Sequence, residues 1–321
     1  MKSPEYQAVV FAAGGGPGLG ELSGTLPKCL LPVANVPMLW YPLCSLQTAG
    51  FTEAIVLVPE GSASEIQRAL SGNNCPDLEI RTEFVSVPAA EDSGSVSILS
   101  RLAEKITRDL VLIGSDFVSD LCLRKVLDFH IARDSSLTCV LSSACVQGSI
   151  PGPKTKQKQT ADLVAIDAHS GRLLLLVSEA DYEEEVPFSR NLLFRFPNVD
   201  LTSKLEDCRV YVVKKWILDY MANKNEFSSF KGEVIPDILK KQYHNNNLLP
   251  KEIKSQLEPD PLDLFARQLS HNAAVQENVA RWENDWVKCF AYAPGAEDGG
   301  KFTARCHTKG AYFEANKQVG R

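Results

Sequence analysis

Residues 6–37 of the sequence are YQAVVFAAGGGPGLGELSGTLPKCLLPVANVP, and this stretch decides the fold. It begins with the apolar run Ala8–Ala12, whose length is typical of a buried strand. A glycine-rich loop follows at Gly14–Gly20, where the backbone can adopt positive φ and approach a ligand closely. Lys28 then stands as one cation in an apolar segment between two prolines. A glycine-rich loop at the end of a strand is where an open α/β sheet binds phosphate groups.

Outward from this stretch, strand patterns alternate with helical patterns. Strands are expected at 7–12, 54–58, 79–87, 110–113 and 137–141, and helices at 38–49, 64–70, 93–106 and 121–133. Further along, the pattern predicts a hairpin of strands at 163–167 and 173–177, strands at 192–196, 209–213 and 287–293, and helices at 215–221 and 232–241. This alternation predicts βαβ units and a doubly wound, mainly parallel sheet.

The same patterns predict the domain organisation. Residues 1–242 are expected to form one α/β domain, with a mobile loop at 148–160, where two prolines and three lysines interrupt the apolar pattern. The polar residues 243–261 are expected to be a loop or linker. Residues 262–321 are expected to supply C-terminal helices and a strand that pack on the domain.

The composition is that of a globular protein, since 44% of the 321 residues are hydrophobic and 23% are charged. The net charge of -6 provides no basic surplus for binding nucleic acid. The nine cysteines contain no C-x-x-C pair, which predicts reduced thiols and no metal site. We see neither a secretory signal nor an apolar run of transmembrane length. These features predict a cytosolic protein.

Two common glycine motifs are absent from the loop. A P-loop requires a lysine directly after its last glycine, and none follows Gly20. The dinucleotide fingerprint G-x-G-x-x-G fails in every register of Gly14–Gly20. Because Pro27 and Pro32 argue against a long helix after the loop, we expect a wide, irregular loop that returns to the sheet near Lys28.

A strand that ends in A-A-G-G-G, followed by P-K-x-L-L-P, resembles the signature of the sugar-nucleotide pyrophosphorylases. The resemblance implies a Rossmann-like fold of the nucleotidyltransferase type. In that family, glycines and cations surround the reacting phosphates, and aspartates hold magnesium, as phosphoryl transfer requires. The positions in this chain that match the nucleotide-binding motifs are Gly14, Gly15, Gly16, Lys28, Gly94 and Asp116, of which Asp116 matches the first metal aspartate.

The chain departs from this signature at the loop arginine, where it has Gly18. No neighbour replaces the missing guanidinium. The second metal aspartate has no clear counterpart: Asp200 and Asp219 are candidates by position alone, and Asp120 is a candidate to join Asp116. Losing the phosphate-binding cation removes a large electrostatic contribution to catalysis. We therefore expect a retained fold with no catalytic residues and no cofactor.

Two of the matching residues have alternative interpretations. Lys28 either retains an anion site or extends its amine out of an apolar segment into solvent. Asp116 either binds a cation or caps the turn after its strand.

Longer segments are similar to the gamma-subunit family of eukaryotic translation initiation factor 2B, notably PKCLLPVANVPMLWYPL, SEADYEEE and YFEANKQV. The similarity extends from Tyr6 to near Val319. It implies a structural and stimulatory subunit of the complex that exchanges GDP for GTP on initiation factor 2. The implied partners are the epsilon subunit, then the alpha, beta and delta subunits, and initiation factor 2, with no membrane and no direct nucleic-acid contact.

The resemblance also implies a C-terminal left-handed β-helix, which the sequence does not reach by Arg321. We therefore expect an N-terminal part of the family's chain. Two alternatives stay open. One is an active sugar-nucleotide pyrophosphorylase that uses magnesium with its nucleotide, and the other is a sensor that binds a nucleotide sugar without converting it.

Overall fold

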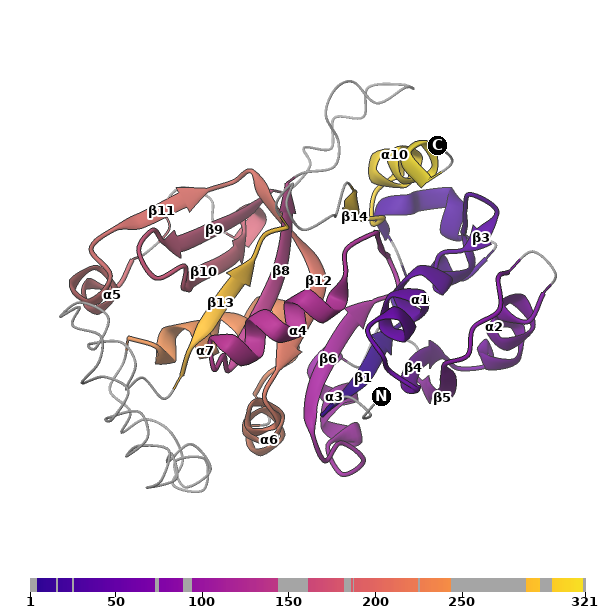
Figure 1. Ribbon diagram of the computed structural model, residues 1–321, viewed down its shortest axis with the longest axis horizontal. Coiled ribbons are helices and arrows are strands. Elements are labelled where there is room, and N and C mark those ends of the chain that lie inside the picture. Colours follow the sequence, from indigo (N-terminus) through magenta and orange to yellow (C-terminus); the bar gives the residue numbers. More distant parts are fainter. Residues whose placement is uncertain are drawn as a thin grey trace.

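The computed structural model describes residues 5–15, 17–24, 26–72, 75–88, 94–143, 161–181, 186, 188–224, 226–243, 287–294 and 302–319. Its centre is a seven-stranded sheet with the strand order β13-β8-β12-β6-β1-β4-β5 (Figure 1). The strands are β1 (Tyr6–Phe11), β4 (Glu53–Pro59), β5 (Arg81–Val87), β6 (Asp109–Gly114), β8 (Leu137–Ser143), β12 (Leu205–Val213) and β13 (Cys289–Tyr292). All neighbours pair in parallel except β12, which is antiparallel to β6 and β8.

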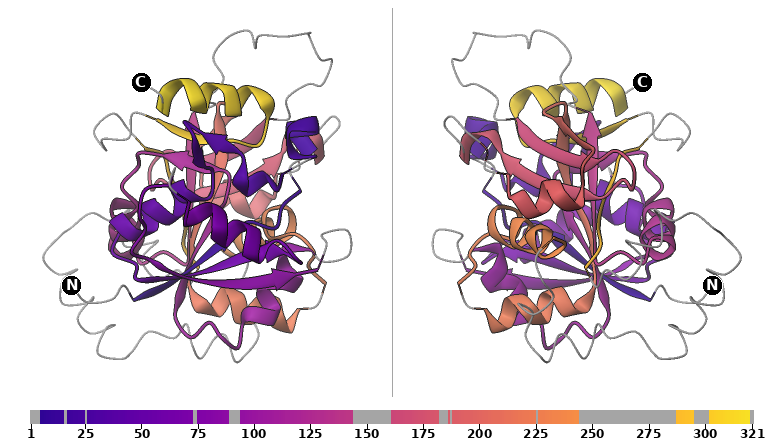
Figure 2. Two further views of the ribbon diagram at one scale, coloured as in Figure 1. Left: turned by 90° about the vertical axis from the view of Figure 1, so that its right-hand side faces the viewer. Right: turned by 90° about the vertical axis from the view of Figure 1, so that its left-hand side faces the viewer.

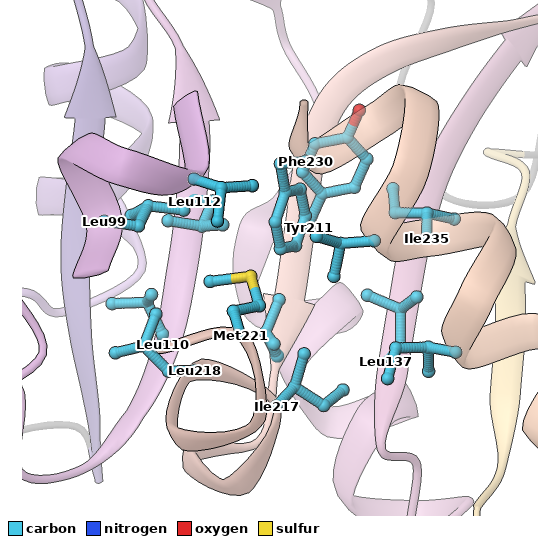
Figure 3. Packing of buried hydrophobic residues seen from close by; sticks show 14 of the residues in the cluster. Leu99, Leu110, Leu112, Leu137, Tyr211, Ile217, Leu218, Met221, Phe230 and Ile235 are labelled. Atoms are coloured by element: carbon cyan, nitrogen blue, oxygen red, sulfur yellow. The ribbon is translucent and has the colours of Figure 1, made fainter. Parts of the chain in front are cut away.

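Helices cover both faces of this sheet, which confirms the predicted doubly wound, mainly parallel fold (Figures 1 and 2). They are α1 (Trp40–Thr48), α2 (Ala63–Leu70), α3 (Ser95–Leu102), α4 (Leu123–Ala132), α6 (Lys215–Asn223) and α7 (Ile235–Lys241). Val9 and Leu112 pack in one core cluster with α3, α6 and α7 (Figure 3), whereas Val10 and Val111 pack in a second cluster with α1, α2 and α4. Because both faces are buried, the central strands are continuously apolar.

A second, antiparallel sheet has the order β10-β9-β11. It consists of β9 (Asp162–Asp167), β10 (Leu173–Ser178) and β11 (Val199–Thr202), and α5 (Arg190–Arg195) precedes β11. The predicted hairpin at 163–167 and 173–177 is confirmed. The predicted strand at 192–196 is wrong, because these residues belong mainly to α5. Helical spacing buries Leu192 and Phe196 together and leaves Phe194 exposed.

Residues 302–319 return to the beginning of the chain. They form β14 (Thr303–Arg305) and α10 (Lys309–Val319), and β14 pairs with β7 (Phe117–Ser119). The helix α10 contacts the hairpin of β2 (Pro32–Val33) and β3 (Val36–Pro37) and the short helix η1 (Pro17–Ser23), above one end of the sheet (Figures 1 and 2). The sequence analysis expected C-terminal helices within 262–321 but placed none at α10, and it did not predict the β7–β14 pair.

Three short helical segments complete the described elements: η2 (Lys28–Leu30), η3 (Glu179–Asp181) and the π-helix η4 (Phe230–Val234). None of the helices in the described ranges is long and apolar enough to span a bilayer. The predicted loop at 148–160 and most of the predicted linker at 243–261 lie outside the described residues. The division of the chain at residues 242 and 261 stays a prediction, although β13, from beyond that linker, pairs with β8 in the main sheet.

Candidate functional site

The glycine loop and Asp116 lie side by side because their strands are neighbours. β1 and β6 pair in parallel from Tyr6 opposite Asp109 to Phe11 opposite Gly114. The amide of Ser115 donates to the carbonyl of Phe11 at 2.9 Å, which joins the two strand ends. The carboxyl ends of two adjacent parallel strands therefore form the candidate site, as expected for an open α/β sheet.

Lys28 is buried at this site and points at Asp116. Its Nζ donates to Asp116 Oδ2 at 2.7 Å, and the two side chains are 8% and 3% exposed. This arrangement differs from both interpretations offered by the sequence, since the amine contacts a carboxylate rather than solvent or a free anion. η2 holds Lys28 in place, with Cys29 and Leu30 buried beside it.

A second cation, Arg305, reaches the same carboxylate from β14. Its Nε donates to Asp116 Oδ2 at 3.3 Å, and the amide of Cys306 donates to the Asp116 carbonyl at 2.7 Å. Burial alone would raise the pKa of Asp116, but the positive charges of Lys28, Arg305 and Arg209 outweigh it and hold this pKa well below its usual range. The Asp116 carboxylate is therefore ionised, and the positive side chains around it balance its negative charge.

Gly18 shows why the loop carries no arginine here. A Cβ at this position would lie 2.3 Å from the carbonyl oxygen of His307, which is backbone and cannot step aside easily. At Gly14 and Gly15, by contrast, nothing lies within 4 Å of an added Cβ, so the backbone there faces open space. Gly16 lies outside the described residues.

Gly94 is the N-cap residue of α3, and another part of the chain covers the first turn of this helix. A Cβ on Gly94 would lie 2.2 Å from the carbonyl oxygen of Ser228. That oxygen accepts a hydrogen bond from the Val96 amide at 3.2 Å, and Ser95 Oγ accepts one from the Phe230 amide at 2.8 Å. The chain thus uses the Val96 amide, one of the donors that this helix N-terminus could offer to an anion.

Among the described residues, the candidate aspartates do not join Asp116 in a site that fits a magnesium ion. The candidate Asp120 accepts a hydrogen bond from the Phe302 amide, Asp219 pairs with Lys215 on α6, and Asp200 lies on β11 of the second sheet. Within the ranges that the structure describes, no group of three or more His, Cys, Asp or Glu side chains is arranged to hold a metal ion. The described cysteines are all free thiols.

Sequence reasoning missed Arg305 and Arg209. Arg305 lies in a three-residue strand without a motif, so no local signal identifies it. Arg209 has φ 54 in β12, where the pairing with β8 shifts register, and its side chain passes 3.2 Å from an added Cβ on Gly114. A non-glycine residue with positive φ at a bulge beside a site is a feature of functional regions, but only coordinates show it.

Comparison with known proteins agrees with this fold. A family described as nucleotidyl transferase matches residues 7–145. The solved structure of a putative glucose-1-phosphate thymidylyltransferase from Bacillus anthracis superposes with a TM-score of 0.55 at 12% identity, over 98% of this chain and 95% of that one. At this identity the likeness shows the fold, which is the predicted nucleotidyltransferase-like α/β fold.

Other relatives are similar along nearly the whole chain. The translation initiation factor eIF2B subunit gamma of Schizosaccharomyces pombe is 30% identical, over 99% of this chain and 66% of its own length. The epsilon subunit of the same species is 22% identical, over 89% of this chain and 42% of its own length. The eIF2B subunit gamma of Caenorhabditis elegans is 30% identical over 316 residues.

These 316 residues are 98% of this chain and 68% of the C. elegans protein, so the chain spans about two thirds of the gamma-subunit relatives it matches. A similarity that covers both the glycine loop and the C-terminal segment with Arg305 shows more than a shared fold. The chain belongs to the family of the gamma subunits of translation initiation factor eIF2B.

Proposed function

We propose that this chain is a non-catalytic subunit of the initiation factor 2B complex, with a structural and stimulatory role in the exchange of GDP for GTP on initiation factor 2. The observation that carries the proposal is the Asp116 carboxylate, which is held by Lys28 at 2.7 Å and by Arg305 at 3.3 Å. The membership of the chain in the gamma-subunit family supports the assignment to this complex.

The physical argument concerns charge. Nucleotidyl transfer depends on cations and N–H groups that neutralise charge as it develops on the reacting phosphates. Here the amine of Lys28 is committed to Asp116, and position 18 has no room for a side chain. Recruiting Lys28 to a phosphate would leave a buried carboxylate with one cation fewer, which is strongly unfavourable. On this proposal, the site around Lys28 and Asp116 is a remnant of a nucleotidyltransferase site and needs no cofactor.

The function then resides on outer surfaces that contact other proteins. We propose the epsilon subunit as the first partner, followed by the alpha, beta and delta subunits and initiation factor 2, in the cytosol. Co-expression with an epsilon-type subunit tests this directly, and we expect the two chains to co-purify in equal amounts. Two chains that elute separately at micromolar concentration would contradict the proposed pairing.

An activity assay tests the non-catalytic role separately. The chain is incubated with magnesium, each nucleoside triphosphate and sugar 1-phosphates, and released pyrophosphate is measured. We expect no release above that of the Asp116→Ala variant. Magnesium-dependent turnover that is abolished by Asp116→Ala or Lys28→Ala would instead establish an active sugar-nucleotide pyrophosphorylase.

The open backbone at Gly14 and Gly15 favours one second candidate, a sensor that binds a nucleotide or nucleotide sugar without converting it. Calorimetric titration with GTP, ATP and nucleotide sugars tests it. Binding that weakens in a Gly15→Val variant would support the sensor, because the new side chain fills the open space above the loop. Flat titrations across the whole set of ligands would eliminate it.

A further inference from the structure

The contact between Asp116 and residues 302–319 joins two distant parts of the chain. β14 lies antiparallel to β7 with Arg305 opposite Phe117, the residue after Asp116. The amide of Cys306 donates to the Asp116 carbonyl at 2.7 Å. The backbone pairing thus delivers the Arg305 side chain to the carboxylate.

The positive charges of Lys28 and Arg305 at the Asp116 carboxylate disfavour the binding of a metal ion there. Arg305 and Lys28 both donate to Oδ2 of Asp116, and the Arg305 side chain is only 11% exposed. A divalent cation needs about six oxygen ligands at roughly 2.0–2.6 Å, and at this carboxylate it would stand beside two positive charges. Burial makes their repulsion stronger than it would be in water.

The same segment also determines what position 18 can hold. The carbonyl oxygen of His307, two residues beyond Arg305, occupies the space where a side chain at Gly18 would begin. An arginine at position 18 and the observed path of residues 302–319 are therefore mutually exclusive. Both the missing loop cation and the blocked carboxylate follow from one structural feature.

We propose that Arg305 is the resident cation of Asp116, standing where a divalent metal ion would have to bind, and that it thereby fixes residues 302–319 across the glycine loop. The inference does not depend on the subunit role, since it concerns only groups within this chain. It makes Asp116 a positioning residue for the C-terminal segment. Cys306 and Ala315 pack with Leu19 and Leu31 on the same side, so the ion pair and an apolar cluster hold the segment together.

Hydrogen exchange tests the fixing of the segment. In Arg305→Met, we expect the amides of α10 to exchange faster by about tenfold or more, because losing one partner of a buried ion pair favours local opening. Arg305→Lys should retain much of the protection. Arg124→Met is the matched control, since it removes an arginine whose ion pair with Asp128 is exposed, and it should change nothing in α10.

Manganese binding, followed by electron paramagnetic resonance, tests the exclusion of a metal ion. We expect wild type to bind Mn²⁺ no better than Asp116→Asn does. Binding by wild type that Asp116→Asn abolishes would overturn the proposal, as would unchanged exchange of α10 in Arg305→Met. If Arg305→Met does not fold, Arg305→Gln replaces it, because the amide keeps hydrogen-bond donors and removes the charge. Unchanged α10 exchange in Arg305→Gln would then overturn the proposal.

Discussion

Gly18 and Gly15 are two glycines of one loop with opposite surroundings. An added Cβ at Gly18 meets the His307 carbonyl oxygen at 2.3 Å, whereas at Gly15 it meets nothing within 4 Å. We expect Gly18→Ala to lower the free energy of unfolding by about 1–3 kcal/mol, as overpacking does. Gly15→Ala should stay within about 0.5 kcal/mol of wild type. Urea denaturation measures both, and equal midpoints would show that position 18 is not crowded.

Asp116 is expected to couple stability to pH. Because Asp116→Asn leaves two buried cations without their carboxylate, it should cost about 3–5 kcal/mol at pH 7. The native pKa of Asp116 lies well below that of the unfolded chain, so the ionised carboxylate stabilises the fold above about pH 4. On further acidification the unfolded state takes up the proton first. The difference in free energy of unfolding between wild type and Asp116→Asn therefore shrinks.

Urea titrations of wild type and Asp116→Asn from pH 7 to pH 3 measure this difference. Asp128→Asn is the control, because the ion pair of Asp128 with Arg124 is exposed and contributes little. A difference between wild type and Asp116→Asn that stays constant down to pH 3 would contradict the expectation.

His130 also makes the folded protein less stable as the pH falls, but for a different reason. Burial and the nearby Lys214 lower its pKa to about 4, and its Nδ1 lies 2.8 Å from Thr138 Oγ1. The unfolded histidine takes up a proton near pH 6.5, before the native one can, so stability is lost as the pH falls from about 6.5 to 4. We expect a loss of about 3 kcal/mol over this range.

The variant His130→Gln should flatten that slope, because glutamine can still contact Thr138 and does not titrate. Burial and Arg305 likewise lower the pKa of His307 to about 4, so part of the slope should persist in the variant. NMR provides the direct measurement. An imidazole of His130 that titrates near pH 6.5 in the folded protein would disprove the assignment.

At the scale of elements, side chains of α10 hold the hairpin β2–β3: Tyr312 Oη donates to the Pro32 carbonyl, and Asn316 contacts the turn. Asn316 Oδ1 accepts a hydrogen bond from the Ala34 amide at 3.0 Å, and Ala34 and Asn35 both have positive φ, 46 and 67. Asn316→Ala should cost about 1 kcal/mol, the typical net contribution of such a bond. Gln318→Ala, on the exposed part of the same helix, should be nearly neutral. Thermal unfolding compares the two variants, and equal losses would mean that the hairpin contact contributes nothing.

The element α5 shows where local patterns fail. Residues 192–196 are three apolar residues, one arginine and another apolar residue, a run too short to separate strand from helix. The helix is favoured because Leu192 and Phe196 then share a face that packs against the second sheet with Leu174 and Ala165. Packing against the second sheet therefore decided that these residues form a helix and not a strand.

At the scale of the molecule, the sheet is stabilised by two large cores. Leu99 of α3 is fully buried in the cluster of Figure 3. Leu99→Ala should lower the free energy of unfolding by about 2–5 kcal/mol, the usual range for a buried leucine. Leu201→Ala is the control, because Leu201 is 53% exposed. Similar losses for both variants in urea denaturation would contradict this description of the core.

The sequence by itself determined the succession along the chain of the strands and helices that build the main sheet and its covering layers, the glycine loop after β1 and the position of Asp116 after β6. These features are local, because apolar periodicity and glycine spacing report the residues next to them. It also marked Gly18 as the departure from the nucleotidyltransferase signature.

Only the tertiary structure decided what Lys28 and Asp116 do. Lys28 and Asp116 are 88 residues apart in sequence, and Arg305 is 189 residues from Asp116. No spacing rule connects them, because the pairing of β14 with β7 brings Arg305 into place. The sequence placed a predicted phosphate site at the ends of β1 and β6, and the return of residues 302–319 across the glycine loop brings the positive charge of Arg305 to Asp116 at that place.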